Sequence, residues 1–467
     1  MIKEKKLKMS PLVWLVGVAA IIFFACSSFR HAMFQSSADD LGFFDNAVYL
    51  ISQGLRPFVV LNNHLHILGD HAAYMLYPMA LLYKIIPDVH WLFAVQAVSL
   101  ALGAVPTFYL AKEAGLDKAQ AVAMAVVYLL YPQVFNVNLF DFHPEVMALP
   151  AILAAVLAAR LDQVGWFCLC IIIILGCKAV LALTVAAMGF WLLVFEKRRL
   201  YGAIALSAGI AWFLIATQVI LPTFGVSHPS AIGRYSYLGH SILEIAKNLL
   251  LRPGPILSRV FTEVNFGYLL LLISPVIWGL SPRHLTPLIG AIPTLVLNLI
   301  TDYKPQKDLL HQYSVPIVPF LLLAVIANLG AGGGWLRSRR FIILWALVAF
   351  LVLAKYNKLW SYLSSVDTWQ ANREVIALIP PQVGVLTTNA LAPHLTHRPV
   401  VKLVLRNLDL INYSQVDYIL LNVRHPGGDS PHKSVIRLAR QLQQTSEYQL
   451  THARDDVLLF EKSHTSN

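Results

Sequence analysis

The chain has 467 residues, of which 57% are hydrophobic and 13% are charged, and its mean hydropathy is +0.62. A soluble protein carries about 25% charged residues, so this composition excludes an ordinary soluble domain and predicts a protein that crosses a membrane several times. The net charge of +11 does not indicate nucleic-acid binding, because the basic residues occur in short runs between apolar segments.

Eleven apolar segments predict membrane-spanning helices, starting with the run from Pro11 to about Phe29. No small-residue cleavage site follows this first run, so we expect a retained anchor, rather than a cleaved signal peptide, with the preceding lysines in the cytoplasm. A shorter apolar stretch at 72–87 is expected to lie in the membrane interface. The ten further spans are expected at 89–111, 119–135, 145–160, 164–177, 179–195, 201–221, 266–281, 285–301, 312–329 and 340–356.

The strongly basic clusters all fall on one side of this topology. With a cytoplasmic N-terminus, the EKRR run at 196–199 and the RSRR run at 337–340 are also cytoplasmic, as the positive-inside rule requires. The connections on the other side, above all the long first loop at 30–88, collect a group of histidines and aspartates. The sequence therefore predicts a site that faces outward.

The last part of the chain, 357–467, is much more polar than residues 1–356. The VGVLTT and VDYILLN sequences predict short buried strands, and residues 372–378 and 434–444 predict helices. We expect a separate α/β domain here, which an odd number of spans places outside the membrane.

The first polar loop carries the acidic residues that attract most interest. The sequence DLGFFDNAVYLISQG, from Asp40 to Gly54, predicts a helix. One interpretation makes Asp39 or Asp40 the N-cap of this helix, and an aspartate at a helix start can also face a substrate. Asp45 lies five residues further on and cannot share a helix face with Asp40, so it either lines the site or faces water.

Two histidines of the same loop, His64 and His66, have a spacing that puts both on one side of an extended chain. With Asp70 and His71 nearby, they are candidates to hold a divalent metal. The alternative is a set of surface or hydrogen-bonding histidines, which is favoured because the chain has no helical zinc motif of the HExxH type.

Three later groups of polar residues border predicted spans on the outer side. Ionisable groups such as His143 and Glu145 are rare at membrane depth unless they form ion pairs or take part in function. The equal alternative is that they are ordinary residues at the start of an interfacial helix, where the helix dipole stabilises Glu145. Lys178, at a predicted outward turn, is either a snorkelling lysine or a phosphate partner. Lys304 and His311 either hold an anionic head group or belong to an ordinary basic loop.

Four sequence elements together resemble a known family. The run DLGFFDNAVYLISQGLRPF, with GDH at 69–71, FHPE at 142–145 and HQYSVPIVPF at 311–320, resembles a family of bacterial predicted membrane proteins of unknown function. That family is itself similar to the GT-C membrane glycosyltransferases. The resemblance covers most of residues 36–400. It implies a bacterial inner-membrane enzyme that moves a sugar from a polyprenyl-phosphate donor to a lipid or glycan acceptor.

The resemblance also implies roles for individual residues. Asp40 occupies the position of the acidic residue in the first outer loop of GT-C enzymes, although Leu41 stands where many of them have a second acidic residue. Lys178 matches a lysine of the relatives, but Ala179 follows it where an acidic residue is common. On this basis Asp40 would be the general base, and Lys178 and Lys304 would stabilise the leaving phosphate.

Taken together, the sequence predicts an α-helical polytopic membrane protein of about eleven spans with a GT-C-like fold, residues 1–356. A small extracytoplasmic α/β domain, residues 357–467, follows it. The expected catalytic residues are Asp40, Asp45, His71 and His143. The expected substrate-binding residues are His64, Asp70, Glu145, Lys178, Lys304 and His311.

Two other classes of function remain open at this stage. A transporter or flippase for a lipid-linked glycan would use the same polar cluster to bind rather than to react, but the chain has neither internal repeats nor polar residues at the middle of its spans, which transporters tend to have. A scaffold whose outer domain binds other envelope proteins is the third hypothesis.

Overall fold

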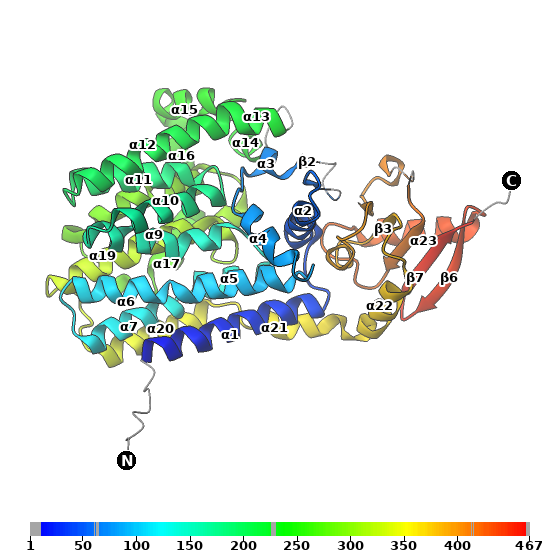
Figure 1. The fold of residues 1–467 in the computed structure, drawn as a ribbon, viewed down its shortest axis with the longest axis horizontal. Helices are drawn as coiled ribbons and strands as arrows, with labels where there is room; N and C mark the ends of the chain where they lie inside the picture. Colours follow the sequence, from blue (N-terminus) through cyan, green and yellow to red (C-terminus); the bar gives the residue numbers. More distant parts are fainter. Residues whose placement is uncertain are drawn as a thin grey trace, which may run out of the picture.

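The computed structural model describes residues 11–59, 61, 65–225, 230–411, 413 and 415–463. Figure 1 shows a bundle of helices that is continued at one end by a smaller body built on a β-sheet. The apolar core of the bundle draws on helices from α1 to α20, so one continuous core holds this part of the molecule together.

Most of the bundle consists of apolar helices at the positions of the predicted spans. The helices at these positions are α1 (Pro11–Ala32), α5 (His90–Leu102), α6 (Ala104–Glu113), α7 (Lys118–Leu129), α8 (Pro132–Asn138), α9 (Glu145–Arg160), α10 (Val164–Cys177), α11 (Leu181–Val194), α12 (Arg199–Ile215), α17 (Glu263–Ile273), α18 (Ile292–Ile300), α19 (Val318–Gly330) and α20 (Arg339–Leu353). The other elements of the bundle are α2 (Phe43–Ser52), β1 (Phe58–Val59), β2 (Leu65–His66), α3 (Ile67–Asp70), α4 (Leu76–Tyr83), α13 (Leu221–Phe224), α14 (Ser230–Gly233), α15 (Ile242–Leu251), α16 (Pro253–Val260) and α21 (Lys358–Ser361).

Within the described residues, five helical segments are long and apolar enough to cross a membrane, or seven if each of two bent pairs counts as one span. The bent pairs are α7 with α8, at 43°, and α16 with α17, at 60°. Helices α10 and α11 have 14 residues each, which gives a rise of about 21 Å against a hydrocarbon core of about 30 Å. A multi-pass membrane protein is confirmed, and the number of eleven spans stays a prediction.

The hairpin of α10 and α11 is held in place by close packing against α12. A Cβ atom on Gly189 would lie 2.3 Å from the backbone nitrogen of Leu206, and one on Gly209 would lie 2.5 Å from that of Ala186. Small residues allow membrane helices to approach this closely. The packing fixes the turn between α10 and α11, which carries Lys178.

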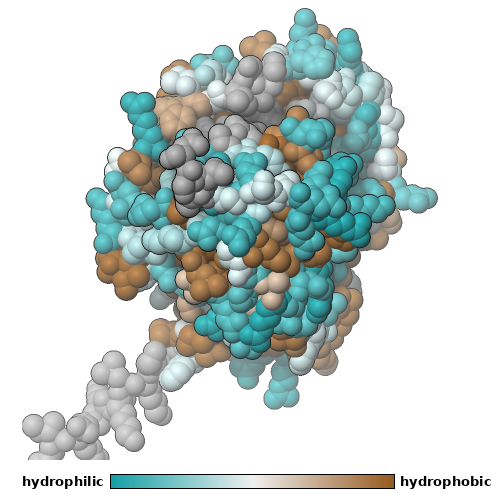
Figure 2. Space-filling model, turned by 90° about the vertical axis from the view of Figure 1, so that its right-hand side faces the viewer, coloured by the Kyte–Doolittle hydropathy of each residue, from teal (hydrophilic) through white to brown (hydrophobic). Residues whose placement is uncertain are grey.

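Beyond the bundle, the C-terminal unit (residues 366–462) is a sheet covered by one helix on each face. The strands β3 (Val385–Thr387), β4 (Val401–Leu403), β5 (Tyr418–Asn422), β6 (Tyr448–Arg454) and β7 (Val457–Lys462) have the order β4-β3-β5-β7-β6. β3 is parallel to β4 and β5, whereas β7 is antiparallel to β5 and β6. The end of the molecule that this unit forms is mostly hydrophilic (Figure 2).

Alternating side chains of the sheet enter two separate cores, as a pleated strand requires. Leu420 packs with residues of α22 (Val366–Leu378), whereas its neighbours Ile419 and Leu421 pack with α23 (His432–Gln444). The two predicted strands and two predicted helices of this region are confirmed. β4, β6 and β7 were not predicted.

The segment between α1 and α2 joins the C-terminal unit to the bundle. Phe34 and Ala38 are buried in the same core as Val375 and Leu391, so this segment completes the apolar core of the C-terminal unit. The indole N–H of Trp369 donates a hydrogen bond to the Ala32 carbonyl at 2.8 Å. The position of the acidic first loop therefore depends on the C-terminal unit.

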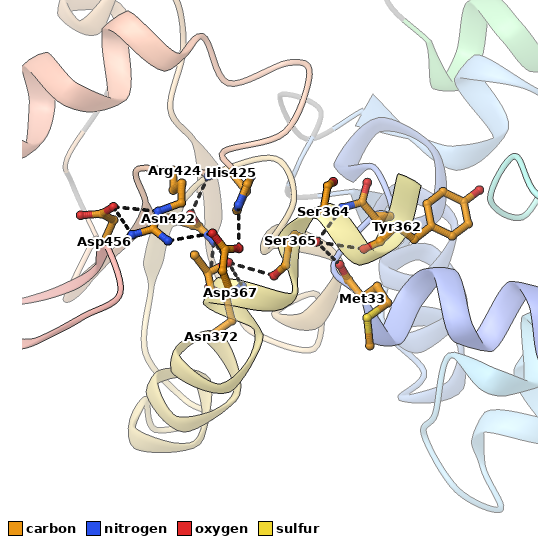
Figure 3. Close-up of polar contacts among 12 residues, drawn as sticks. Met33, Tyr362, Ser364, Ser365, Asp367, Asn372, Asn422, Arg424, His425 and Asp456 are labelled. Atoms are coloured by element: carbon orange, nitrogen blue, oxygen red, sulfur yellow. Dashed lines mark hydrogen bonds and ion pairs between the residues drawn. The ribbon is translucent and has the colours of Figure 1, made fainter. Parts of the chain in front are cut away.

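Polar contacts around the start of α22 strengthen the same junction (Figure 3). The Ser365 hydroxyl donates to the Met33 carbonyl at 2.9 Å and accepts a hydrogen bond from the Gln35 amide at 2.8 Å. Two residues on, Asp367 pairs with Arg424 at 2.7 Å and lies 2.9 Å from His425. These contacts tie the end of α1 to α22, and α22 to the loop that follows β5.

The topology can be tested with single cysteines at two exposed serines, Ser338 and Ser446. The basic residues next to Ser338 are expected to stay in the cytoplasm, so Ser338→Cys should be protected from an impermeant thiol reagent in intact cells without an outer barrier. Ser446→Cys, in the C-terminal unit, should react. Labelling of Ser338→Cys together with protection of Ser446→Cys would reverse the predicted orientation.

A buried pair of histidines lies in the junction between the C-terminal unit and the bundle. His394 stacks on His31 of α1, with ring centroids 3.9 Å apart. Burial, with a smaller contribution from the charge of His90, lowers the pKa of His394 to about 4. A hydrogen bond with the His31 backbone and the charge of Asp45 act in the opposite direction but are weaker than burial. The packed junction therefore favours neutral His394.

We expect this histidine to make the stability of the protein fall in acid. Because the pKa of about 4 in the folded protein lies below the ordinary value of 6.5, the unfolded chain takes up the proton first. Stability is then complete above pH 6.5 and is lost as the pH falls toward 4. His394→Phe keeps the stacked ring, so its thermal unfolding midpoint should fall less than that of the parent across this range. Exposed His432, changed to Phe, is the control. Equal slopes for parent and His394→Phe would contradict the assignment.

Candidate functional site

Asp40 lies in a π-helical turn, Ala38–Gly42, directly before α2. Ser37 is the N-cap, because its hydroxyl accepts a hydrogen bond from the Asp39 backbone N–H at 3.3 Å. The expectation that Asp39 or Asp40 caps the helix is therefore wrong. Single π-helical turns occur frequently at functional sites, and this one leaves the Asp40 carboxylate free for other contacts.

The main partner of Asp40 is His143, from the loop between α8 and α9. The Nε2 atom of His143 lies 3.2 Å from Oδ1 of Asp40, and its buried ring stacks on Phe140 with centroids 5.1 Å apart. Burial alone would raise the pKa of Asp40, but the hydrogen bond and charge of His143, together with the charges of Arg30 and His311, lower it below its ordinary value. Asp40 is thus a carboxylate at neutral pH.

The neighbouring Asp39 is in a different electrostatic environment. Burial, followed by the negative charges of Asp429 and Asp40, raises the pKa of Asp39 to about 6. Asp429 belongs to the C-terminal unit and accepts a hydrogen bond from the Asn389 amide at 3.0 Å. The C-terminal unit therefore contributes a carboxylate next to the site, which the sequence analysis did not predict.

A buried ion pair holds the two loops of the site together. Arg30, near the end of α1, lies 2.8 Å from Oδ1 of Asp141, and the Ser37 backbone N–H donates to Oδ2 of the same carboxylate at 2.9 Å. Asp141 is two residues before His143, and Ser37 is three residues before Asp40. This pair therefore sets the distance between the carboxylate and the imidazole.

A second group of charged residues continues from His143. The Lys178 ammonium donates to Oε1 of Glu145 at 2.6 Å, and only 19% and 5% of their respective side chains are exposed. Nearby, His71 lies 2.5 Å from the carboxylate of Asp70. Burial would raise the pKa of Asp70, but the charges of His71, Lys178 and Arg234 lower it to about 2. These residues form one cluster of alternating charge, the outer cluster, at the end of the bundle that is predicted to face outward.

Arg234 is the functional candidate that the sequence analysis missed. Its guanidinium donates to Gln306 at 3.2 Å and to the Tyr313 hydroxyl at 3.1 Å. It also lies over two aromatic rings, 4.2 Å from the centroid of Tyr303 and 5.1 Å from that of Tyr313. The structure gives it no ion pair with any described carboxylate. Only contacts between loops far apart in the sequence identify this arginine, so no local signal could have found it.

Several other predicted residues lie at the edge of this cluster or outside it. His311 borders it, with its ring 4.3 Å from that of Phe140 and its Nδ1 atom 2.7 Å from Asp308. Lys304 is exposed in a 3-10 turn, and no contact of its side chain with the cluster occurs in the described structure. Lys304 is therefore not supported as a phosphate ligand by its present contacts.

Asp45 is not part of the group that surrounds Asp40. Its buried carboxylate accepts hydrogen bonds from Tyr83, at 2.5 Å, and from Thr396, and it lies 3.1 Å from His397. Asp45 of α2 therefore contacts α4 and the C-terminal unit. These contacts favour a structural role in place of the expected catalytic one.

The proposed metal pair can be examined only in part. His64 lies outside the described residues. The Nδ1 atom of His66 accepts a hydrogen bond from the Leu68 backbone N–H at 3.2 Å, and its ring stacks on Phe224. Among the residues that the structure describes, no three His, Cys, Asp or Glu side chains are arranged to hold a metal ion. The metal site stays a prediction.

Comparison with known proteins identifies both a family and a fold. The model of a family of predicted membrane proteins, DUF2079, matches residues 30–459. Among curated proteins, none matches the chain. The fold is similar to that of ArnT from Cupriavidus metallidurans bound to undecaprenyl phosphate, with a TM-score of 0.56 and 13% identity over 97% of this chain and 98% of that chain.

Two further solved structures are more distant. Apo ArnT from the same organism has a TM-score of 0.47 and 12% identity, over 96% of this chain and 97% of that chain. The archaeal oligosaccharyltransferase AglB from Archaeoglobus fulgidus, in complex with an inhibitory peptide and a dolichol-phosphate, has a TM-score of 0.43 and 11% identity, over 98% of this chain and 74% of that chain. ArnT and AglB are GT-C glycosyltransferases, and the similarity to the first ArnT structure confirms the predicted GT-C-like fold.

The buried pair of Arg30 and Asp141 should be needed for stability. Asp141→Asn leaves a buried guanidinium without its counter-charge, so the free energy of unfolding should fall by about 3 kcal/mol. Asparagine tolerates the positive φ of this position, +50°, so the substitution adds little backbone strain.

The matched control is Asp162→Asn, which removes an exposed aspartate–arginine pair at a residue with a similar φ of +56°. An exposed pair contributes about 1 kcal/mol or less, so this variant should unfold almost like the parent. Equal losses in the two variants, measured by denaturant unfolding of the purified protein, would show that the Arg30–Asp141 pair does not hold the site together.

Proposed function

Because the chain belongs to the DUF2079 family of predicted membrane proteins and has a GT-C-like fold, we propose that it is a glycosyltransferase of the bacterial inner membrane. It transfers a sugar from a polyprenyl-phosphate donor to an acceptor hydroxyl on the extracytoplasmic side. One observation carries the proposal: the ionised carboxylate of Asp40, 27% exposed, lies beside a buried histidine in a cluster that also holds Lys178 and Arg234.

Asp40 acts as the general base. The acceptor oxygen forms a bond to the anomeric carbon of the sugar while its proton passes to Asp40, and the bond from that carbon to the donor phosphate breaks with the electron pair on the phosphate. His143, 3.2 Å away, holds the carboxylate in position. The stacked ring of Phe140 and the neighbouring Arg30–Asp141 pair restrict movement of both groups.

Arg234 and Lys178 bind the donor phosphate. The charge on this phosphate grows as its bond to the sugar breaks, so fixed cations stabilise the transition state more than the ground state. Arg234 presents a planar, permanently charged group that suits phosphate, and its stacking on Tyr303 and Tyr313 fixes its orientation. Lys178 is held by Glu145, and both cations act electrostatically on Asp70. In this assignment Arg234 takes the role that the sequence analysis gave to Lys304.

The function can be tested with Asp40→Asn. This change keeps the size of the side chain, and Ser37 still caps the helix, so the fold should be retained. It removes the proton acceptor, and a general base typically contributes a factor of about 10²–10⁴ in rate, so turnover should fall by that much while donor binding survives. The assay follows polyprenyl-phosphate sugars by mass spectrometry in a strain that lacks the protein and in strains that carry each variant. The deletion strain should accumulate the donor.

Asp39→Asn is the matched control, because Asp39 is one residue away and has no contact with His143. Its turnover should change much less than that of Asp40→Asn. Turnover of Asp40→Asn within about threefold of the parent would remove the base assignment, given the expected effect of a general base. Movement of an intact lipid-linked glycan across the membrane, without consumption of any donor, would show that the protein is a flippase instead.

A further inference from the structure

An apolar groove of about 1000 Å³ runs along the outside of α1, on a part of the bundle that the proposed reaction does not use. The neighbouring wall is formed by α7 and α8, and Phe350 of α20 also lines the groove. Trp14, Val18 and Ile22 of α1 line it and are each about half exposed or more. Exposed apolar side chains in such a groove suit a hydrocarbon chain.

The groove is longer than one leaflet of a bilayer. Its lining on α1 extends from Pro11 to Cys26, and fifteen helical steps rise about 22 Å. The hydrocarbon core is about 30 Å thick, so a single leaflet measures about 15 Å. The acyl chain of a common glycerolipid covers one leaflet, whereas a polyprenyl chain is long enough to fill the whole groove.

Both walls of the groove lead to the catalytic cluster. On α1, Cys26 lines the groove, and Arg30, one turn further on, pairs with Asp141 at 2.8 Å. On the other wall, Phe135 of α8 lines the groove, and the loop that follows α8 carries the Asp141 carboxylate and His143. The head group of a lipid in the groove would therefore lie next to Asp40.

Two lysines stand at this end of the groove, beside the lining residues Tyr356 and Leu359. Lys355 is exposed and Lys358 is partly buried, and neither forms an ion pair in the described part of the chain. The Lys355 backbone N–H donates to Asn136 at 2.7 Å, which fixes this segment to α8. Lys358 is within electrostatic reach of Arg30 and Asp308, both at the edge of the cluster. Unpaired lysines at the end of an apolar groove suit a lipid phosphate.

We propose that this groove binds the polyprenyl chain of a second lipid, which carries the acceptor hydroxyl and whose phosphate is bound by Lys355 and Lys358. The inference rests on the proposed function. In the proposed function Arg234, directly after α14, binds the donor phosphate, and in the view of Figure 1 α14 lies in the upper part of the bundle and α21 at its lower side, with α2 at a height between them. Both substrates are therefore polyprenyl-linked, they approach Asp40 from two sides, and the product is a longer lipid-linked saccharide.

The test counts the lipids that bind to the purified, full-length protein. Undecaprenyl phosphate is the probe, and native mass spectrometry gives the number bound per chain. We expect two in the parent, one in the double variant Lys355→Gln/Lys358→Gln and one in Arg234→Gln. Ala19→Trp fills the groove and should remove the same lipid as the lysine variant. Lys433→Gln/Arg437→Gln, at exposed positions of α23, is the charge-matched control and should keep two.

The possible outcomes separate this inference from the proposed function. One outcome is a single lipid in the parent that is lost equally in the lysine variant and in Arg234→Gln. The groove would then hold the chain of the donor lipid. This result overturns the second lipid site and leaves the proposed function in place. Displacement of the groove lipid by phosphatidylglycerol at equal concentration would overturn the polyprenyl assignment. Two lipids in Arg234→Gln would overturn the proposed donor site and with it the acceptor role of the groove lipid.

Discussion

The buried ion pair of Arg30 and Asp141 is the contact on which the site depends. Asp141 forms an ion pair with Arg30 at 2.8 Å and accepts a hydrogen bond from the Ser37 backbone N–H at 2.9 Å, so one carboxylate joins the end of α1, the turn before α2 and the loop before α9. Asp40 and His143 each lie within three residues of these anchors, which is why their side chains meet. Because little water reaches the pair, the removal of either charge costs far more than the loss of an exposed pair would.

The C-terminal unit is part of the same construction. Phe34 and Ala38, from the segment that carries the site, complete its apolar core, and Asp429 from its loop acts on Asp39. Asp45 of α2 binds Thr396 of the same unit. A chain that ended after the bundle would leave these apolar and polar groups without partners. We therefore regard the C-terminal unit as one wall of the site.

The sequence predicted the apolar helices of the bundle, and two strands and two helices of the C-terminal unit, because hydropathy and strand alternation are local properties. It also singled out Asp40, His143 and Lys178, since charged residues stand out between apolar spans. The errors have a common cause, which is that sequence distance is a poor guide to spatial distance. Asp45 is close to Asp40 in the chain but contacts Tyr83 of α4 and the C-terminal unit instead of His143, whereas Arg234 is far away in the chain and becomes recognisable only through its contacts with a distant loop.

In the proposed reaction a phosphate-linked donor lies between Asp40 and the cations of the outer cluster. The most direct measurement is an experimental structure of the full-length protein with undecaprenyl phosphate bound. We expect one phosphate in contact with Arg234 and Lys178, on the side of Asp40 away from α21. A structure in which no phosphate contacts either cation, with the lipid head group far from Asp40, would contradict the claim.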